Sequence, residues 1–301
     1  MTKRFYSHGK LLLTSEYVVL DGAKALAIPT KKGQSLEVAR SNNQNLKWLS
    51  FLENHKLWID LKIELPLHKP TNDLAPTELR LKQILWEVYK LRPSLFENGL
   101  SLYSELEFDR SWGLGSSSTL INNIAQWARI DAYELLKKTF GGSGYDIACA
   151  SASGPITFQL KSQKPHVTKV VFDPIFKEDL FFIHLNKKQN SRESIKQYKA
   201  TKPEDLDPII EKISQITNAI IATTNKTHFE EQIDNHERII SDLIKTPTIK
   251  EQLFSDYSSG SIKSLGGWGG DFILATGTEK DKTYFIDKGY TTILSYEEMT
   301  L

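Results

Sequence analysis

Short runs of apolar or alternating residues, separated by turn residues, make the first 65 positions rich in strand-like patterns. Asp21-Gly22 is the clearest turn signal among them, because both residues accept the positive φ that tight hairpins require. The pattern predicts strands over residues 11–13, 17–20, 25–28, 35–40, 46–52 and 57–63.

The middle of the chain mixes helical and strand-like spacing of its apolar residues. Helices are predicted over 77–91, about 116–129 and 132–139, and Gly141-Gly142 ends the last of them. Strands are predicted over 99–108, 155–160, 167–172 and 180–185.

The C-terminal part carries long amphipathic helices, predicted over 204–224 and 227–246, with a shorter one over 248–255. Strands are predicted over 272–275, 283–286 and 291–294. Strands mixed with segregated helices are typical of an α+β fold, here in two lobes. We place the boundary near Asp173-Pro174, which divides the chain into domains 1–172 and 173–301.

Composition narrows the functional classes. The net charge is +1, so no global field favours nucleic acid or an anionic membrane. The single cysteine, Cys149, excludes an internal disulfide, and the N-terminal residues lack the apolar stretch of a signal peptide. No apolar run is long enough for a membrane span. We therefore expect a cytoplasmic protein with no nucleic-acid or membrane partner.

One glycine- and serine-rich segment stands out, running from Trp112 through Gly113, Leu114, Gly115, Ser116, Ser117 and Ser118 to Thr119. It directly precedes a predicted helix, whose first N–H groups and positive dipole end attract anions. The serine hydroxyls would be available to phosphate or a metal ion. The alternative is an ordinary helix cap, because Ser and Thr are favoured there and no Walker-type lysine follows.

Three further segments accompany this loop. Ser7-His8-Gly9-Lys10 is followed by a stretch from Ser15 to Gly22 that reads Ser-Glu-Tyr-Val-Val-Leu-Asp-Gly. A Gly-Ser-Gly-Tyr-Asp-Ile-Ala run spans 142–148, and Lys-Ser-Leu-Gly-Gly-Trp-Gly-Gly-Asp spans 263–271. In this order the four segments resemble the GHMP kinase superfamily of galactokinase, homoserine kinase, mevalonate kinase and phosphomevalonate kinase. The Gly-Tyr-Asp-Ile-Ala quintet resembles its bacterial subgroup with that signature.

The resemblance implies a two-lobed fold, with an N-terminal mixed α/β lobe, a C-terminal ferredoxin-like lobe and an ATP site between them. It places the catalytic lysine and aspartate on Lys10 and Asp146. A carboxylate can accept the proton of an attacking hydroxyl, and a nearby lysine offsets developing charge. Without the resemblance, Asp146 reads as a turn residue and Lys10 as a solvated surface lysine.

The resemblance also implies ATP and Mg²⁺ as cofactors. Residues 113–118 would hold the nucleotide phosphates, and Ser117 would contribute a hydroxyl to Mg²⁺, which prefers hard oxygen ligands. Glu134 is a second candidate metal ligand, but Asp131 three residues earlier favours the alternative, in which Glu134 belongs to a helix capping box. The residues assigned to acceptor binding are Glu16, Tyr17, Ser143, Gly144, Lys187, Ser191, Gly267, Gly269 and Gly270.

Several positions depart from the family pattern. Ser7-His8 replaces the usual Ala-Pro, and 27 residues separate Ser118 from Asp146, fewer than in most relatives. Trp268 stands where a small residue is usual, and we expect it to pack beneath its loop rather than stack on a ligand. Lys187, Ser191 and Arg192 read equally well as a polar helix start. His236 reads as a mid-helix histidine with a satisfied partner.

The sequence thus predicts an ATP- and Mg²⁺-dependent kinase for a small alcohol or phosphate acceptor, acting as a monomer or homodimer. The stretch from Ser15 to Gly22 looks most like mevalonate and phosphomevalonate kinases, which implies isoprenoid biosynthesis. A sugar or amino alcohol is the alternative acceptor. A non-catalytic sensor of the same fold, which binds ATP and a metabolite, is the rival from another functional class.

Overall fold

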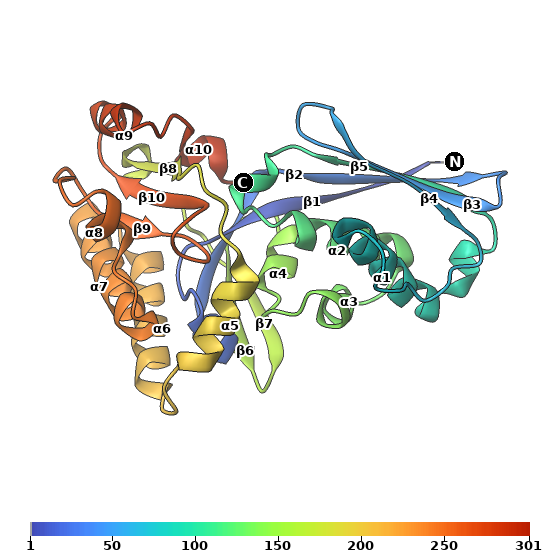
Figure 1. Cartoon of the computed structure of the whole chain (residues 1–301). Coiled ribbons are helices and arrows are strands. Elements are labelled where there is room, and N and C mark those ends of the chain that lie inside the picture. The colour runs from blue at the N-terminus through green and yellow to red at the C-terminus, as the bar shows by residue number, and fades with distance from the viewer. Residues whose placement is uncertain (1) are drawn as a thin grey trace. The chain divides into compact units, whose positions relative to one another are not determined.

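The computed structural model describes residues 2–301, without the side chains of Ser191 and Arg192. The chain divides into two compact units, and Figure 1 shows their elements. Unit 1 contains Met1–Gly9, Lys32–Arg110 and Leu114–Ser151, and unit 2 contains Lys10–Lys31, Ser111–Gly113 and Ala152–Leu301. The sequence-based domains, 1–172 and 173–301, remain a prediction.

A mixed sheet, ordered β4-β3-β5-β2-β6-β7 with β1 paired to β2, supplies strands to both units. Its long strands β1 (Lys3–Leu12) and β2 (Ala25–Ser41) each contribute residues to both. Within unit 1, β3 runs antiparallel to β4 and parallel to β5. The other strands of this sheet are β3 (Asn45–Phe51), β4 (Leu57–Glu64), β5 (Gly99–Leu106), β6 (Ile156–Lys161) and β7 (Lys164–Lys169).

Four helices of unit 1 cover one face of its part of this sheet (Figure 1). Trp48 on β3, Leu85 on α1 and Ile121 on α2 are fully buried in the apolar core between these layers. This burial removes the apolar stripe of each helix from water, which is the main favourable term in folding. The helices are α1 (Pro76–Leu91), α2 (Ser116–Ala128), α3 (Ala132–Thr139) and α4 (Tyr145–Ser151), with the short 3₁₀ turn η2 (Pro93–Phe96). The 3₁₀ turn η3 (Arg110–Trp112) begins in unit 1 and ends in unit 2.

Unit 2 holds a second, antiparallel sheet with the order β11-β8-β10-β9. Numbered along the chain, its strands lie in the order 4-1-3-2, and helices join the first to the second and the third to the fourth. This is the ferredoxin-like arrangement, so the predicted C-terminal lobe is confirmed. The strands are β8 (Leu180–His184), β9 (Ile262–Ser264), β10 (Phe272–Thr276) and β11 (Ile293–Ser295).

The helices of unit 2 include the long pair α6 (Asp207–Ala222) and α7 (Lys226–Ile244), which pack against each other. Phe181, Phe254 and Phe285 are buried in the apolar core of this unit. The remaining helices are α5 (Ser191–Thr201), α8 (Ile249–Leu253), α9 (Lys282–Asp287) and α10 (Tyr296–Met299), with 3₁₀ turns η1 (Val18–Asp21), η4 (Lys177–Asp179) and η5 (Glu279–Asp281).

Two predicted strands are wrong. Residues 17–20 form a turn and η1, because Ser15 and Tyr17 adopt positive φ and break the extended path. Residues 283–286 lie in α9, which follows a capping box between Thr278 and Asp281 and buries Phe285 on one face. Both apolar runs are short, and periodicity alone does not separate strand from helix in such runs. Among residues 2–301, no helix has the length and apolarity that crossing a membrane requires.

Candidate functional site

The glycine-serine loop ends at the start of α2, where Gly115 is the N-cap residue at φ 87°. Gly115 has no side chain with which to cap the helix. The N–H of Thr119 donates to the Gly115 carbonyl at 3.0 Å, so the helix gives the N–H groups of Ser116, Ser117 and Ser118 no acceptor. The side chain of Ser117 is exposed. The start of α2 therefore offers backbone donors to an anion.

A buried polar network within unit 1 fixes this helix on the sheet. The hydroxyl of Ser7 donates to Asn123 Oδ1 at 2.8 Å and accepts from Asn122 Nδ2 at 2.9 Å. The hydroxyl of Thr119 donates to Gln34 Oε1 at 2.6 Å. Ser7, one of the departures from the family pattern, thus holds α2 in place. Ser118 is buried and its hydroxyl donates to the Gly115 carbonyl, so it stabilises the loop internally.

Asp146 lies in the first turn of α4, which packs against α2 within unit 1. Its Oδ1 accepts from the N–H of Ile147 at 3.0 Å. Gly144 at φ 91° lets the chain pass the ring of Tyr133, which a Cβ at that position would approach to 2.8 Å. Burial raises the pKa of Tyr133 to about 12, and the carboxylates of Asp131 and Asp146 add to this shift. The candidate base and the candidate phosphate loop therefore belong to two packed helices.

Lys10 lies beside the first residue of the glycine loop. Its Nζ donates to the Gly113 carbonyl at 2.7 Å. Asp271 lies on the other side of Gly113, and a Cβ on this glycine would come within 2.2 Å of the Asp271 carboxylate. Burial raises the pKa of Asp271, whereas the positive charge of Lys10 lowers it. The sequence assigned no role to Asp271, although its place between Gly270 and an apolar strand is the signal that could have singled it out.

The predicted convergence of Lys10 and Asp146 remains a prediction, because the two residues belong to different units. Within unit 2, the second glycine loop is tied to the segment after β8. A Cβ on Gly270 would meet the Lys187 carbonyl at 2.7 Å, and the Gln189 N–H donates to Asp271 Oδ1 at 3.0 Å. The Lys187 side chain is exposed.

The segment after β8 leads into the N-terminus of a helix. This agrees with one of the two interpretations of Lys187, Ser191 and Arg192, namely that they form a polar helix start. Helix α5 begins at Ser191, and the side chain of Asn190 caps it by accepting from the N–H of Glu193. The side chains of Ser191 and Arg192 lie outside the described residues. Their suggested part in acceptor binding, like that of Lys187, stays a prediction.

Trp268 is 4% exposed and packs into unit 2 at φ 52°. The expectation that it packs beneath its loop is confirmed. Its neighbour Gly267 accepts from the hydroxyl of Tyr17 at 2.9 Å. Gly269 adopts φ 83°, a value that its lack of a Cβ permits. The glycines let this loop bend sharply around the indole.

Tyr17 occupies a tight turn that few residues adopt. Its φ and ψ are 65° and −55°, and the N–H of Val18 donates to the Glu16 carbonyl at 2.8 Å. These features define a γ-turn with positive φ, a rare and strained conformation. Ser15 also has a positive φ of 72°. Strain of this kind persists only where the surrounding structure enforces it, and it is common at functional sites.

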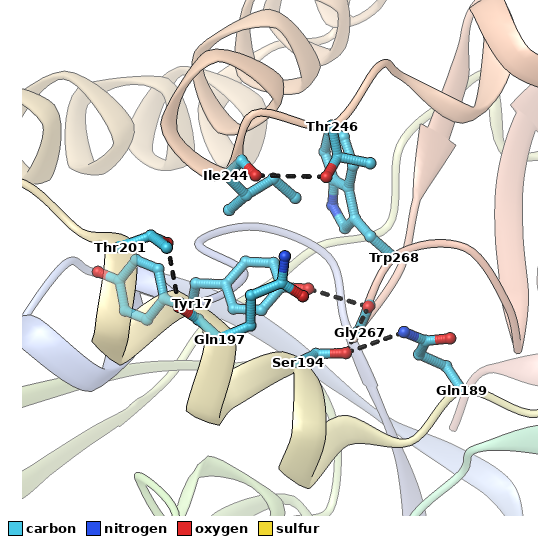
Figure 2. Close-up of a pocket in the computed structure, with 10 residues that line it drawn as sticks. Tyr17, Gln189, Ser194, Gln197, Thr201, Ile244, Thr246, Gly267 and Trp268 are labelled. Carbon is cyan, nitrogen blue, oxygen red and sulfur yellow. Dashed lines mark hydrogen bonds between the residues drawn. The ribbon is translucent and has the colours of Figure 1, made fainter.

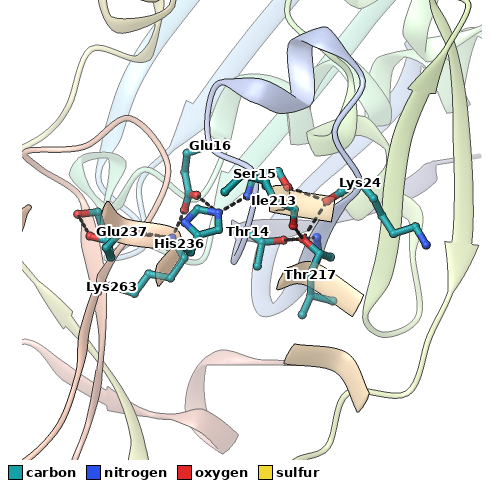
Figure 3. Close-up of polar contacts among 11 residues, drawn as sticks. Thr14, Ser15, Glu16, Lys24, Ile213, Thr217, His236, Glu237 and Lys263 are labelled. Atoms are coloured by element: carbon teal, nitrogen blue, oxygen red, sulfur yellow. Dashed lines mark hydrogen bonds and ion pairs between the residues drawn. The ribbon is translucent and has the colours of Figure 1, made fainter. Parts of the chain in front are cut away.

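A buried charge cluster includes Glu16, the residue before Tyr17 in this turn (Figure 3). Lys263 Nζ donates to Glu16 Oε1 at 2.8 Å and to Glu237 Oε1 at 3.3 Å, and all three side chains are almost fully buried. Burial raises the pKa of Glu16 to about 7, with Lys263 opposing the shift. Burial also raises the pKa of Glu237. Glu16 was assigned to acceptor binding, but its side chain is 0% exposed and faces Lys263.

His236 completes the support of the turn. Its Nε2 accepts from the N–H of Ser15 at 2.8 Å, so this nitrogen has the partner expected of a helical histidine, whereas the buried Nδ1 has no hydrogen-bond partner among the described residues. Burial lowers the pKa of His236 well below its usual value, and the positive charge of Lys263 lowers it further. The ring is therefore neutral, with its proton on Nδ1 while Nε2 accepts. A neutral imidazole fits this position because the Ser15 N–H needs an acceptor.

The residues proposed for Mg²⁺ offer few protein ligands. Among the described residues there is no group of three or more His, Cys, Asp or Glu that could hold a metal ion. Mg²⁺ commonly keeps several waters and binds through phosphate oxygens and one or two protein groups, so the exposed Ser117 hydroxyl fits that role. Asp131 caps α3 by accepting from the N–H groups of Tyr133 and Glu134. The metal role of Glu134, an exposed residue in that first turn, stays a prediction.

Solved structures match this chain over nearly its full length. Mevalonate kinase from Methanococcus jannaschii gives a TM-score of 0.71 at 17% identity, covering 98% of this chain and 97% of its own. Phosphomevalonate kinase from Streptococcus pneumoniae, in complex with phosphomevalonate and AMPPNP, gives 0.70 at 16% identity, covering 98% and 99%. This chain has the GHMP kinase fold.

Other structures with the GHMP kinase fold include galactokinase from Lactococcus lactis complexed with galactose. It gives a TM-score of 0.65 at 14% identity and covers 100% of this chain and 93% of its own. No protein-family model and no curated protein sequence matches the chain. The GHMP kinase fold was predicted from four ordered motifs, and the structural likeness confirms it.

Proposed function

We propose that this protein is an ATP- and Mg²⁺-dependent kinase that transfers the γ-phosphoryl group to a small-molecule acceptor. The observation that carries the proposal is the start of α2, which has a glycine cap and backbone donors without helical acceptors and packs against the helix of Asp146. The GHMP kinase fold supports it, since mevalonate kinase, phosphomevalonate kinase and galactokinase structures share that fold.

Bound Mg-ATP supplies the phosphoryl group, and residues 113–118 hold its phosphates, with Ser117 as the protein ligand to Mg²⁺. Asp146 accepts the proton of the acceptor hydroxyl as that oxygen attacks the γ-phosphorus, and the bond from this phosphorus to the bridging oxygen breaks, so that ADP leaves. Lys10, positioned by the Gly113 carbonyl, offsets the negative charge that develops there.

The acceptor is an alcohol or an existing phosphate. The motif resemblance makes mevalonate and phosphomevalonate, and with them isoprenoid biosynthesis, the first candidates. A sugar or an amino alcohol is the alternative acceptor. A sensor that binds ATP without turnover is the rival function, and ATP consumption over a panel of acceptors separates it from a kinase.

A substitution that adds a negative charge to the first turn of α2 tests whether ATP phosphates bind there. Ser117→Asp adds a negative charge to an exposed residue in the first turn, which repels phosphate but suits the helix dipole. Mg-ATP affinity measured by calorimetry should fall at least about tenfold, equal to ~1.4 kcal/mol. The unfolding midpoint should stay the same or rise.

The matched control is Thr77→Asp, which changes the exposed second residue of α1 in the same way. It should leave Mg-ATP affinity unchanged. Equal losses in both variants would show that the α2 start is not the phosphate site. If the unaltered protein shows no binding at millimolar Mg-ATP, the kinase proposal is wrong.

A further inference from the structure

A cavity of about 220 Å³ opens within unit 2 between the Tyr17 turn, helix α5 and the loop that carries Trp268 (Figure 2). One water needs only about 10–15 Å³ of such space, so the cavity can take a small organic molecule. Four of its residues recur at helical spacing on one face of α5. The lining is Tyr17, Gln189, Ser194, Gln197, Tyr198, Thr201, Ile244, Thr246, Gly267 and Trp268.

The cavity contains a buried donor that the protein does not satisfy. Among the described residues, Trp268 Nε1 is one of the few buried side-chain polar atoms with no hydrogen-bond partner. An unsatisfied buried donor carries an uncompensated desolvation cost that destabilises the fold. The strained turn of Tyr17 lies opposite, with its hydroxyl on Gly267. A ligand oxygen accepting from the indole would remove this cost, which points to a binding site.

The described lining side chains are aromatic, hydroxyl or amide groups, with Ile244 as the aliphatic one, and none carries a formal charge. Lys202 and Asp21 form an ion pair next to the cavity residue Tyr198, whose hydroxyl donates to Asp21 at 2.6 Å. These two charges satisfy each other. A carboxylate or phosphate placed in this cavity would lose hydration without gaining a cation from the described lining, which is unfavourable.

The aromatic and uncharged polar side chains of the lining suit an uncharged ligand. The rings of Tyr17 and Tyr198 lie 5.3 Å apart and offer aromatic surface to the C–H faces of a ligand. The exposed Gln197 projects from α5, and its amide group can donate to and accept from ligand hydroxyls. The Ser194 hydroxyl accepts from Gln189 Nε2 at 2.9 Å and lies 3.3 Å from the Gly267 carbonyl, so it holds the cavity wall together. Aromatic surface with uncharged donors and acceptors matches a polyhydroxylated molecule.

Contacts within unit 2 link this cavity to Lys10. Gly267 and Trp268 line the cavity, and the same loop ends at Asp271, beside Gly113 and Lys10. Gln189, another lining residue, donates through its N–H to Asp271 Oδ1 at 3.0 Å. A molecule in the cavity is therefore held by the loop whose far end contacts the surroundings of the candidate catalytic lysine.

We propose that this cavity binds the non-reacting end of the phosphoryl acceptor, and that this end is uncharged and rich in hydroxyl groups, as in a sugar or polyol. The proposal rests on the proposed kinase function and narrows its substrate class. It places specificity on α5 and Trp268, while Lys10 and Asp146 act at the reacting hydroxyl.

The test pairs neutral and charged acceptors of one skeleton. Galactose and glucose are compared with galacturonate and glucose 6-phosphate, alongside myo-inositol, mevalonate and phosphomevalonate. Thermal stabilisation is measured in the presence of Mg-AMPPNP, and ATP consumption in the presence of Mg-ATP. Stabilisation and turnover should appear with a neutral member and be lost with its charged counterpart.

Two variants test whether acceptor binding depends on this cavity. Trp268→Phe keeps the ring and removes the orphan N–H, so the fold should persist while the KM of the neutral acceptor rises about 3- to 10-fold, the range of one neutral hydrogen bond. Gln197→Glu puts a charge on an exposed lining residue and should raise that KM further. Gln126→Glu, at an exposed position on α2, is the matched control and should leave KM unchanged.

Several results would overturn the proposal: activity only with carboxylate or phosphate acceptors, no stabilisation by any neutral member, or an unchanged KM in both cavity variants. The proposed nucleotide site would stand in each case if Mg-ATP still binds and Ser117→Asp still weakens it, and the kinase function would stand if any acceptor of the panel is phosphorylated. Loss of nucleotide binding altogether would instead reject the proposed function.

Discussion

A cluster of ionisable side chains is buried next to the Tyr17 turn, and each of its members affects the stability of that turn. Lys263 bonds two carboxylates, Glu16 and Glu237, and the neutral ring of His236 accepts from Ser15. One cation facing two buried carboxylates favours the protonated form of one of them, which agrees with the raised pKa values of both. The protonation state of this cluster therefore contributes to the stability of the turn.

The raised pKa of Glu16 predicts a specific pH dependence. Between its ordinary pKa of 4.5 and about 7, the folded protein keeps the proton that the unfolded chain releases. The contribution of Glu16 to stability is thus largest at low pH and decreases as pH rises through this window, by on the order of 3 kcal/mol. The pKa of His236 is lowered in the fold. Its contribution to stability therefore changes in the opposite direction and rises with pH at pH values below its ordinary pKa of 6.5.

The variant Glu16→Gln separates the pH dependence of Glu16 from that of His236, because His236 is present in both the variant and the unaltered protein. From about pH 5 to about pH 8, urea unfolding should show the variant gaining stability relative to the unaltered protein. Glu231→Gln, an exposed change on the helix that carries His236, should follow the unaltered protein at every pH. A relative stability of Glu16→Gln that is flat or falls with pH would show that Glu16 is not protonated in the fold.

Sequence could identify these residues only in part. The motifs singled out Glu16 and Tyr17, but the pairing of Glu16 with Lys263 joins positions 247 residues apart, which no local pattern encodes. The packing of Trp268 was predictable, because a large aromatic among glycines favours burial. Its unsatisfied Nε1 was not predictable, because hydrogen-bond partners depend on tertiary contacts.

At the scale of elements, helices were predicted more accurately than turns. Helix α3 matches its predicted range, and α1 and α2 match within one residue, because an apolar stripe at helical spacing persists over several turns. Residues 17–20 looked like a strand because Val18, Val19 and Leu20 favour one. The positive φ of Ser15 and Tyr17 is imposed by the buried contacts beneath them, and tertiary contacts override propensity there.

The glycine loop provides a test at this scale. Gly113 and Gly141 both have positive φ, 67° and 69°, but a Cβ on Gly113 would strike the Asp271 carboxylate, whereas one on Gly141 meets nothing within 4 Å. Both alanine variants bear the backbone strain of about 1 kcal/mol. Gly113→Ala should lose about 1–3 kcal/mol more in urea unfolding because of the overlap. Equal losses would mean that Asp271 does not pack against this loop.

At the scale of the whole molecule, the fold is that of GHMP kinases although identity to the solved structures compared here is 14–17%. Four ordered motifs were enough to predict it, since their glycines and polar residues mark turns that the fold requires. The motifs contain Tyr17, Gly267 and Trp268 of the cavity lining, but the acceptor was not predictable from them, because other lining residues come from α5 and the turn after α7, which lie outside every motif. Under the proposed role of the cavity, substrate choice depends in part on segments that carry no family signature.

The central claim, phosphoryl transfer with Asp146 as the base, is tested most directly by following γ-labelled ATP. Label should pass from ATP to an acceptor of the panel. Asp146→Asn should retain Mg-ATP affinity and lower turnover by about 10²–10⁴-fold. Lys10→Met should lower turnover much less in the Asp146→Asn background than it does in the unaltered protein. Label transfer to no acceptor despite ATP binding, or near-full turnover in Asp146→Asn, would contradict the account.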